Sequence, residues 1–391
     1  MTGHSVKIAL CLEYPIDQFG GTEVLVSELI KGLAREHQIV LVSAETAESA
    51  KKSSVGRFLA DHVHWNPASI SLRQSQQLAD ALARAKVQVA HFHFGGNYGW
   101  GNRAFDRCPI IHTQRHGIPC VSTNHGAFSI FEGYCGPHRP FLKAALFLPA
   151  WLSKQYVLGH LRCEVAVSQY DYRALRSWYP PMRHKFRQIY HSRLHAPPPV
   201  ITAPRRKAIL CVGSIGLRKG QPLLVEAFGR ISAKHPEWQL ILIGRMADEQ
   251  ITRRIYDVIA HHNLGTRVQF LGGRPDAEVR QWLGEAAIFA MPSSHEGLGL
   301  SLQEALFYGC ACVSTRAGGT VDLVDDHQNG LLVDAGNPGQ LAEALDKLIS
   351  DDALRARLAA RAPQSILDKE MTVEKMVEKY QALYETVLKQ R

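Results

Sequence analysis

The sequence contains 391 residues, of which 46% are hydrophobic and 21% are charged. This composition is typical of a globular protein and excludes a disordered or fibrous chain, and the length allows two or three domains. The longest apolar run, residues 144–152, is far shorter than the roughly 20 residues that span a bilayer. Because the chain begins without an export signal and its eight cysteines form no C-x-x-C pair, we expect a reduced, cytoplasmic location and no metal site.

The net charge of +9 lies entirely in the first half. Residues 1–200 contain 22 Lys and Arg against 13 Asp and Glu, whereas residues 201–391 contain 23 of each. A basic half indicates contact with an anionic membrane, an acidic acceptor or nucleic acid, and an ordinary soluble basic surface is the alternative. No nucleic-acid-binding signature is seen. The apolar segment 141–152, between Lys143 and Lys154, fits either a membrane surface or a core helix.

The first half alternates short apolar runs with amphipathic stretches. The runs are typical of buried parallel strands, which we expect at residues 6–12, 39–43, 87–92, 119–123 and 164–168. Apolar residues at helical spacing predict helices at residues 23–35, 72–85, 140–161 and 171–178.

A proline-rich segment, residues 196–206, predicts an extended linker. After it we expect helices at residues 221–234, 249–263, 277–285 and 301–308, and strands at residues 208–212, 238–243, 268–271, 288–291, 310–314 and 330–333. The final segment, residues 372–389, has an apolar stripe at helical spacing and predicts an amphipathic helix.

Strands that alternate with helices on both sides of the linker indicate an α/β protein with two doubly wound domains. Sheets of this kind bind ligands beyond the carboxyl ends of their strands. We therefore expect a ligand to bind in the cleft between residues 1–195 and residues 207–371.

The most informative motif is Ser294–Glu304, which follows an expected strand and enters an expected helix. Its glycines and the start of the helix would offer backbone N–H groups to an anion. Glu296 lies in the loop. Glu304 lies further along the helix, and its carboxylate can accept hydrogen bonds from sugar hydroxyls. Two structural explanations compete, namely a solvated loop carboxylate at Glu296 and a capping box in which Ser301 caps the helix and Glu304 bonds back to it.

A second motif, Gly213–Gly220, directly follows an expected strand and contains the adjacent cations Arg218 and Lys219. Glycines between a strand and a helix, together with two cations, suit a diphosphate. The spacing matches neither a Walker loop nor a dinucleotide fingerprint. A solvated turn is the competing explanation.

Two motifs of the first half also follow strands. In Phe19–Glu23 the glycines would let a ligand approach, and we expect Thr22 to cap the next helix, with ordinary turn chemistry as the alternative. His125 ends another strand and can hydrogen-bond a sugar hydroxyl or exchange a proton. Simple packing is the competing explanation for His125, and also for His91 and His93 one strand earlier.

In this order the motifs resemble those of the retaining glycosyltransferases of family 4, which have the GT-B fold. The Glu-x7-Glu motif of the family is matched by Glu296 and Glu304. Two further kinds of family motif are matched in the second half. The lysine–glycine pair is matched by Lys219-Gly220, and the glycine-containing turns are matched by Gly297, Gly299, Leu300, Gly318-Gly319 and Asn329–Val333. In the first half the resemblance rests on Gly20-Gly21, Glu23, His91, His93 and His125.

The resemblance implies transfer of a sugar from a nucleotide-diphosphate-sugar donor to a glycan, glycolipid or lipid-linked acceptor. It further implies retention by front-face attack, with no metal or other cofactor. The donor would bind mainly to residues 207–371 and the acceptor to residues 1–195, while the last helix, residues 372–391, would pack back on the first domain. The family's catalytic groups would correspond to His125, Glu296, Lys219 and Arg218. Its donor contacts would correspond to Gly21, Gly213, Arg218, Lys219, Glu296, Gly297, Leu298, Gly299, Leu300 and Glu304.

Three positions depart from the family pattern. Ser214 stands where arginine is usual, so that Arg218 would supply the missing charge, and Gly244–Met246 replaces a Gly-x-Gly. Asp322 stands where glutamate is usual. Two other functions stay open: a nucleotide-sugar epimerase of similar build, and a non-catalytic sugar-nucleotide-binding partner, which the change at Ser214 favours.

Overall fold

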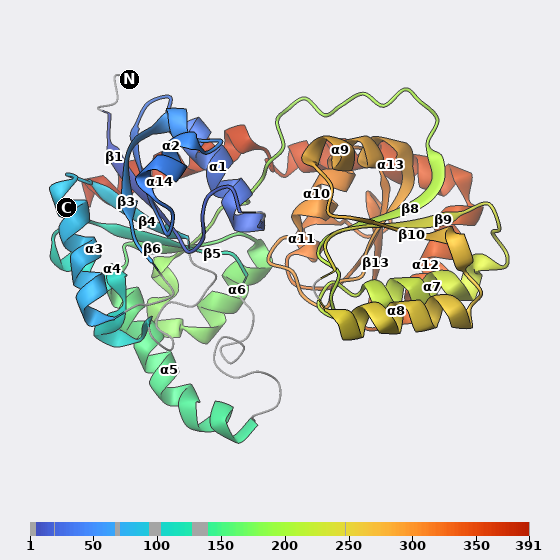
Figure 1. Ribbon diagram of the computed structural model, residues 1–391, viewed down its shortest axis with the longest axis horizontal. Helices are drawn as coiled ribbons and strands as arrows, with labels where there is room; N and C mark the ends of the chain where they lie inside the picture. Colours follow the sequence, from blue (N-terminus) through green and yellow to red (C-terminus); the bar gives the residue numbers. More distant parts are fainter. Residues whose placement is uncertain are drawn as a thin grey trace. The chain divides into compact units, whose positions relative to one another are not determined.

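The computed structural model describes residues 5–18, 20–66, 71–93, 103–126, 140–246 and 248–390. The chain divides into two units (Figure 1). The first unit consists of Met1–Arg193 together with Thr372–Arg391, and the second consists of Leu194–Met371. The last helix therefore belongs to the first unit, although it follows the second unit in the sequence.

In the described part of the first unit, seven parallel strands form a sheet in the order β3-β2-β1-β4-β5-β6-β7. The strands are β1 (Lys7–Leu12), β2 (Gln38–Ser43), β3 (Leu59–His64), β4 (Val89–His93), β5 (Cys120–Asn124), β6 (Cys163–Ala166) and β7 (Phe186–Gln188). The five predicted strands are confirmed as β1, β2, β4, β5 and β6. The edge strands β3 and β7 were not predicted, because β3 is half-exposed and rich in polar residues and β7 has three residues.

Helices cover both faces of this sheet. They are α1 (Gly21–Leu33), α2 (Ala47–Lys52), α3 (Leu72–Arg84), α4 (Pro109–Arg115), α5 (Pro140–His160), α6 (Gln169–Trp178) and α14 (Val373–Lys389), with 3-10 turns at Gly56–Phe58, Phe105–Arg107 and Pro180–Lys185. On one face α1 and α14 share a core that includes Ile30 and Met376. On the other face α3, α4, α5 and α6 share a core that includes Leu82 and Leu158.

In the described part of the second unit, six parallel strands form a sheet in the order β10-β9-β8-β11-β12-β13. The strands are β8 (Arg206–Val212), β9 (Gln239–Ile243), β10 (Val268–Gly272), β11 (Ala286–Met291), β12 (Ala311–Thr315) and β13 (Gly330–Val333). All six correspond to predicted strands. The predicted linker has no helix or strand before Arg206, which begins β8.

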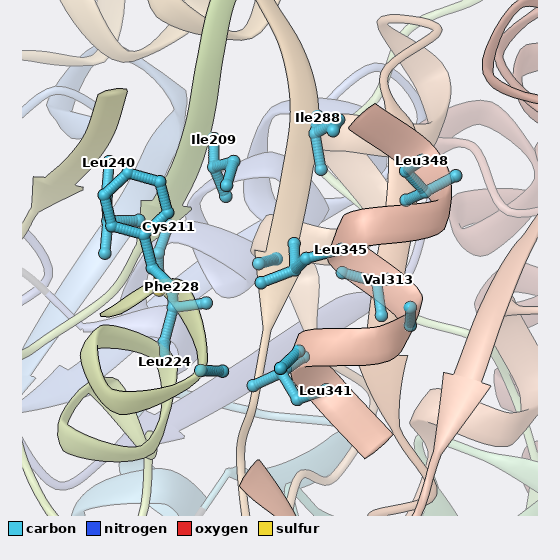
Figure 2. Packing of buried hydrophobic residues seen from close by; sticks show 14 of the residues in the cluster. Ile209, Cys211, Leu224, Phe228, Leu240, Ile288, Val313, Leu341, Leu345 and Leu348 are labelled. Carbon is cyan, nitrogen blue, oxygen red and sulfur yellow. The ribbon is translucent and has the colours of Figure 1, made fainter. Parts of the chain in front are cut away.

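The helices of the second unit are α7 (Gln221–Ser232), α8 (Glu249–His261), α9 (Asp276–Glu285), α10 (Leu300–Phe307), α11 (Thr320–Leu323), α12 (Pro338–Ser350) and α13 (Asp352–Asp368), with a 3-10 turn at Gly265–Arg267. Helices α12 and α13 were not predicted. Figure 2 shows Leu341, Leu345 and Leu348 of α12 within the same buried cluster as Ile288 and Val313 of the sheet. Their spacing of three and four residues was a helical signal in the sequence.

Both units are thus parallel α/β sheets that reverse their strand order once, between β1 and β4 in the first unit and between β8 and β11 in the second. This confirms the predicted class of two doubly wound, Rossmann-like units. A sheet of this topology opens a crevice for ligands at the carboxyl ends of the two strands where the order reverses. Across the described ranges, no helix combines the length and the apolar character that crossing a bilayer requires.

Candidate active site

The loops that follow β8 and β11 meet at the point where the strand order of the second sheet reverses. The backbone N–H of Ser294, in the loop after β11, donates to the carbonyl oxygen of Arg218 at 2.8 Å. The loop after β12 joins them, because the N–H of Glu296 donates to the oxygen of Ala317 at 3.2 Å. Backbone hydrogen bonds therefore hold three loops together at this edge of the sheet.

Two glycines allow these loops to come so close. Gly220 has a φ of 70°, and a Cβ there would lie 2.1 Å from the carbonyl oxygen of Pro292. Gly318 has a φ of 67°, and a Cβ there would lie 2.1 Å from the carbonyl oxygen of Glu296. A side chain at either position would be strained and would separate the loops.

Arg218, Lys219 and Glu296 come together in these loops, as the family resemblance implies. The Nζ of Lys219 lies 2.7 Å from Oε1 of Glu296, and the Nη1 of Arg218 lies 3.2 Å from the same oxygen. Burial of the Glu296 carboxyl opposes ionisation, but the charges of Lys219 and Arg218 outweigh it and lower the pKa of Glu296. Glu296 is therefore an ionised, buried carboxylate, and its interpretation as a solvated loop residue is wrong.

Gln221 is a buried polar residue of this site that sequence reasoning missed. Its side-chain oxygen accepts from the N–H of Gly216 at 3.1 Å, and its Nε2 donates to the carbonyl oxygens of Ser214 at 3.2 Å and Gly213 at 3.4 Å. The side chain thus fixes the glycine loop that precedes Lys219. A lone glutamine at the start of a helix carries no sequence signal of burial, because such positions usually face water.

Helix α10 begins at Leu300 and is capped by Gly299, which has a φ of 95°. The carbonyl oxygen of Gly299 accepts from the N–H groups of both Leu302 and Gln303 at 3.0 Å. Ser301 is therefore the second residue of the helix, so the capping box between Ser301 and Glu304, which was the competing explanation, is wrong. A left-handed glycine, rather than the serine, ends the loop. The first N–H groups of α10 have no acceptor within the helix.

In the first unit, the carboxyl ends of β4 and β5 bring His93 and His125 together. The Nδ1 of His93 lies 3.2 Å from the Nε2 of His125. Asn124 shapes the turn beside them, because its side-chain oxygen accepts from the N–H of Gly126 at 3.0 Å. Burial lowers the pKa of His125 to about 4 and that of His93 well below its ordinary value. Both rings are therefore neutral near pH 7.

The two histidines of β4 differ in their surroundings. His91 has both ring nitrogens bonded, Nδ1 to the Tyr384 hydroxyl at 2.6 Å and Nε2 to Thr123 Oγ1 at 2.8 Å, so it is the packed histidine that was the competing explanation. The Nε2 of His93 is buried and has no hydrogen-bond partner among the described residues. His93 also lines a pocket of about 330 Å³ at the start of α1.

The glycine motif after β1 forms much of this pocket, whose other described lining residues are Glu13, Tyr14, Gln18, Gly20, Gly21, Thr22 and Glu23. Helix α1 begins at Gly21 and Gly20 precedes it as the cap, so the prediction that Thr22 caps the helix is wrong. A Cβ at Gly20 would lie 2.0 Å from a carboxylate oxygen of Glu23, so a larger residue there would displace that side chain. Burial raises the pKa of Glu23. Phe19 lies outside the described residues.

The implied site residues divide between the two units. Gly21 and His125 lie in the first, at the ends of strands or starts of helices, and Gly213, Arg218, Lys219, Glu296, Gly297, Leu298, Gly299, Leu300 and Glu304 lie in the second. Within the second unit they come from the loops after β8 and β11 and from α10. Among the residues that the structure describes, no group of three or more His, Cys, Asp or Glu side chains could hold a metal ion.

Two family models match the sequence, one on each unit. Residues 19–192 match the model described as "Glycosyltransferase Family 4", and residues 199–365 match "Glycosyl transferases group 1". A curated relative, the D-inositol 3-phosphate glycosyltransferase of Corynebacterium jeikeium, is 34% identical over 163 residues. That match covers 41% of this chain and 39% of the relative, so the chain spans about two fifths of the relative's length.

Solved structures share the fold across nearly the whole chain. A glycosyltransferase from Rickettsia africae has a TM-score of 0.75 at 18% identity and covers 100% of both chains. Alr3699/HepE from Anabaena, crystallised with UDP and glucose, has a TM-score of 0.73 at 16% identity and covers 97% of this chain and 100% of its own. From both family models, together with the GT-B architecture, we conclude that the chain belongs to the group 1 glycosyltransferases of family 4.

Proposed function

We propose that this protein is a retaining glycosyltransferase that moves a hexose from a nucleoside-diphosphate sugar to a glycan, glycolipid or lipid-linked acceptor. Family membership supports this function, as do the relative that is named a glycosyltransferase and the structural neighbour that holds UDP and glucose. One observation carries it. Arg218, Lys219 and the ionised Glu296 meet where the strand order of the second sheet reverses.

The second unit is proposed to bind the donor. Arg218 and Lys219 bring two positive charges against one negative charge of Glu296, and the surplus suits a diphosphate. The first N–H groups of α10, at Leu300 and Ser301, and the helix dipole add to this attraction. Glu304 is buried within α10, and its carboxylate is proposed to accept hydrogen bonds from the ribose hydroxyls.

The remaining donor contacts are proposed to be made through backbone. Gly213, Gly297 and Gly299 have no side chain that would keep a phosphate or sugar from the peptide groups. Leu298 is buried and fixes the loop between the two glycines. In the first unit Gly21, which begins α1, is proposed to approach the donor in the same way.

The chemistry follows from where charge develops. The bond between the anomeric carbon and the β-phosphate oxygen breaks, and the electron pair leaves with the phosphate. Lys219, Arg218 and the α10 amides stabilise that oxygen more in the transition state than in the ground state. The acceptor hydroxyl then bonds to the anomeric carbon from the same face and gives its proton to the leaving phosphate, so the configuration is retained.

The first unit is proposed to bind the acceptor and the transferred sugar. His125 is neutral, so one ring nitrogen can donate a hydrogen bond and the other can accept one. Its Nε2 bonds to His93, and its Nδ1 is proposed to bond to a sugar hydroxyl. The pocket beside Gly21 and His93 lies at the reversal point of this sheet and is a second place for a hydroxylated ligand.

Helix α5 supports peripheral contact with an anionic membrane. Leu148 and Leu152 are 58% and 47% exposed and, with Tyr156, follow one another at four-residue spacing on one side of the helix. The opposite side is packed in the core, and the exposed side is the one proposed to contact the membrane. Lys154 is buried and pairs with Glu164 at 2.7 Å, so it adds no surface charge, and the Lys143 side chain lies outside the described part.

The test is a panel of nucleotide sugars, screened first for a rise in melting temperature, since a ligand that binds the native state stabilises it. Donors that bind are then radiolabelled and incubated with free and lipid-linked acceptors, with and without a chelator. Transfer that is unaffected by the chelator and keeps the anomeric configuration is the expected result. Isomerised donor without acceptor would instead identify an epimerase, and binding with no turnover a non-catalytic partner.

A further inference from the structure

Helix α14 carries two hydroxyl groups into the core of the first unit. Tyr380 and Tyr384 are 0% and 2% exposed, whereas their neighbours on the same face, Met376 and Val387, are apolar. Apolar contacts alone would dock this helix on the sheet. Buried hydroxyls add no stability unless they are hydrogen-bonded, so the partners of these two indicate what they do.

The two hydroxyls belong to one continuous chain of hydrogen bonds. The Tyr384 hydroxyl lies 2.6 Å from His91 Nδ1, and His91 Nε2 lies 2.8 Å from Thr123 Oγ1. Thr123 Oγ1 lies 2.9 Å from the Tyr380 hydroxyl, which in turn lies 2.6 Å from His191 Nε2. Both tyrosines of α14 thus bond to histidines that lie elsewhere in the fold.

The direction of the two bonds at His91 follows from counting protons. In the described part of the chain, His91 Nδ1 is the hydrogen-bond partner of the Tyr384 hydroxyl. Tyr384 therefore donates this bond, because its hydroxyl hydrogen would otherwise be buried without an acceptor. His91 then accepts at Nδ1, carries its proton on Nε2 and donates to Thr123. The Tyr380 hydroxyl is bonded on one side to Thr123 Oγ1 and on the other to His191 Nε2. His91 is thereby held in one tautomer, and the bond to Tyr380 holds the ring plane of His191.

His91 and His191 both lie close to His125, the proposed catalytic residue. His91 packs against His93, which bonds to His125, and His191 contacts His125 directly. The rings of His91 and His93 are 3.9 Å apart between centroids, and His93 bonds to His125 at 3.2 Å. The ring of His191 packs edge-on against His125, with centroids 5.2 Å apart. His125 therefore lies between two rings whose orientations depend on α14.

We propose that Tyr380 and Tyr384 are positioning residues for His125, because their hydroxyls fix the tautomer of His91 and the ring planes of His91 and His191. This inference rests on the proposed function, in which His125 contacts the transferred sugar. The network acts through geometry and not through charge. Burial lowers the pKa of His91 and His191 and raises that of both tyrosines, so every member is neutral near pH 7.

The test replaces each hydroxyl alone, with Tyr384→Phe, Tyr380→Phe and the double variant of the full chain. Transfer kcat is expected to fall about tenfold in each single variant while KM for the donor stays within about twofold, since misplacement of a catalytic group slows chemistry more than binding. Imidazole nitrogen NMR of the free protein is expected to show His91 as the Nε2–H tautomer in the wild type and as a mixture in Tyr384→Phe.

The matched control is Met376→Ala, which removes buried volume from the same face of α14 and leaves every hydroxyl in place. It is expected to lower the melting temperature without changing kcat or the histidine spectra. Phenylalanine variants that lose stability but keep both kcat and the wild-type tautomers would overturn the inference. If the wild type transfers no sugar, the proposed function fails instead, and the tautomer spectra still decide whether the tyrosines position these rings.

Discussion

Glu296 is a buried ionisable side chain and His125 a half-buried one, and their surroundings give them different charge states. Lys219 and Arg218 keep Glu296 ionised despite burial, whereas His125 contacts the neutral rings of His93 and His191 and is itself neutral. A fixed carboxylate–cation cluster suits recognition of a charged donor. A neutral imidazole suits hydrogen bonding to sugar hydroxyls. The second unit therefore offers a charged cluster, and the first unit offers a neutral imidazole.

Replacing Lys219 by alanine should lower turnover by roughly 10²–10³-fold, which is the loss seen when one donor to a developing oxyanion is removed. Arg218→Ala should lower it less, because the guanidinium is about half exposed and 3.2 Å from Glu296. Steady-state transfer kinetics measure both. Lys207→Ala, an exposed lysine at the other end of β8, is the control. Normal turnover in both site variants would reject the assignment.

Replacing Glu304 by glutamine should weaken nucleotide binding and leave the fold intact. A hydrogen bond to a charged group contributes about 1.5–3 kcal/mol, so Kd should rise roughly 10- to 150-fold. No large loss of stability is expected, because Glu304 does not cap α10. Calorimetric titration and thermal unfolding separate the two effects, with Glu343→Gln on α12 as the control. Unchanged affinity would remove Glu304 from the donor site.

The stability of the protein should fall as the pH falls from 6.5 to 4. The folded-state pKa of His125 is about 4 against 6.5 when unfolded, so in this window the unfolded state binds more protons. Burial also lowers the pKa of His91, His93 and His191, so the free energy of unfolding depends more steeply on pH. Urea unfolding at several pH values measures the slope. In His125→Asn the slope should be shallower. An identical slope would show that the pKa of His125 is not lowered in the folded protein.

At the scale of elements, α5 and α14 use their apolar residues in different ways. In α14 the apolar face is buried against α1 and the sheet. In α5 one side packs in the core, whereas Leu148 and Leu152 face solvent on the other, next to the ring of Tyr156. Tyr156 in turn contacts the exposed Phe105, with ring centroids 6.0 Å apart. An apolar surface of this kind is typical of a binding face.

The double variant Leu148→Ser, Leu152→Ser should reduce binding to anionic phospholipid vesicles by at least about tenfold, since each leucine that enters the interface contributes about 1–2 kcal/mol. Cosedimentation with anionic and with zwitterionic vesicles measures the effect. Leu72→Ser removes an equally exposed leucine from α3 and should change nothing. Equal binding of wild type and double variant would show that α5 does not contact the membrane.

The sequence predicted the interior of the fold better than its boundaries. Strands buried on both faces are continuous apolar runs, which is why β1 and β8 were found, whereas the polar edge strand β3 gave no such signal. Helix starts at Gly20 and Gly299 were misplaced because side-chain caps were expected where left-handed or extended glycines act.

The candidate site was predictable where a linear motif carries it. Sequence motifs with fixed spacing identified the pair Glu296 and Glu304, and they also identified Lys219 and His125. Contacts made only in the folded chain were not readable. Gln221 folds back on its own loop, and the bond between His91 and Tyr384 joins residues 293 positions apart.

At the scale of the whole molecule, the two sheets repeat one plan. Each reverses its strand order once, and each has candidate residues at the carboxyl ends of its strands near that point. In the first sheet Gly21 begins the helix after β1, His93 ends β4 and His125 follows β5, and in the second sheet Lys219 and Glu296 lie in the loops after β8 and β11. The charge is divided as well, with the surplus of +9 in the half that is proposed to meet the acceptor.

The return of α14 to the first unit has a consequence for synthesis on the ribosome. Residues up to Arg193 emerge first, but the face of α1 that packs on Met376 and Val377 stays uncovered until the whole second unit has been translated. Nascent domains tend to fold in the order in which they are made. Here the second unit can finish folding before the first, whose exposed core during that interval is a natural place for a chaperone to act.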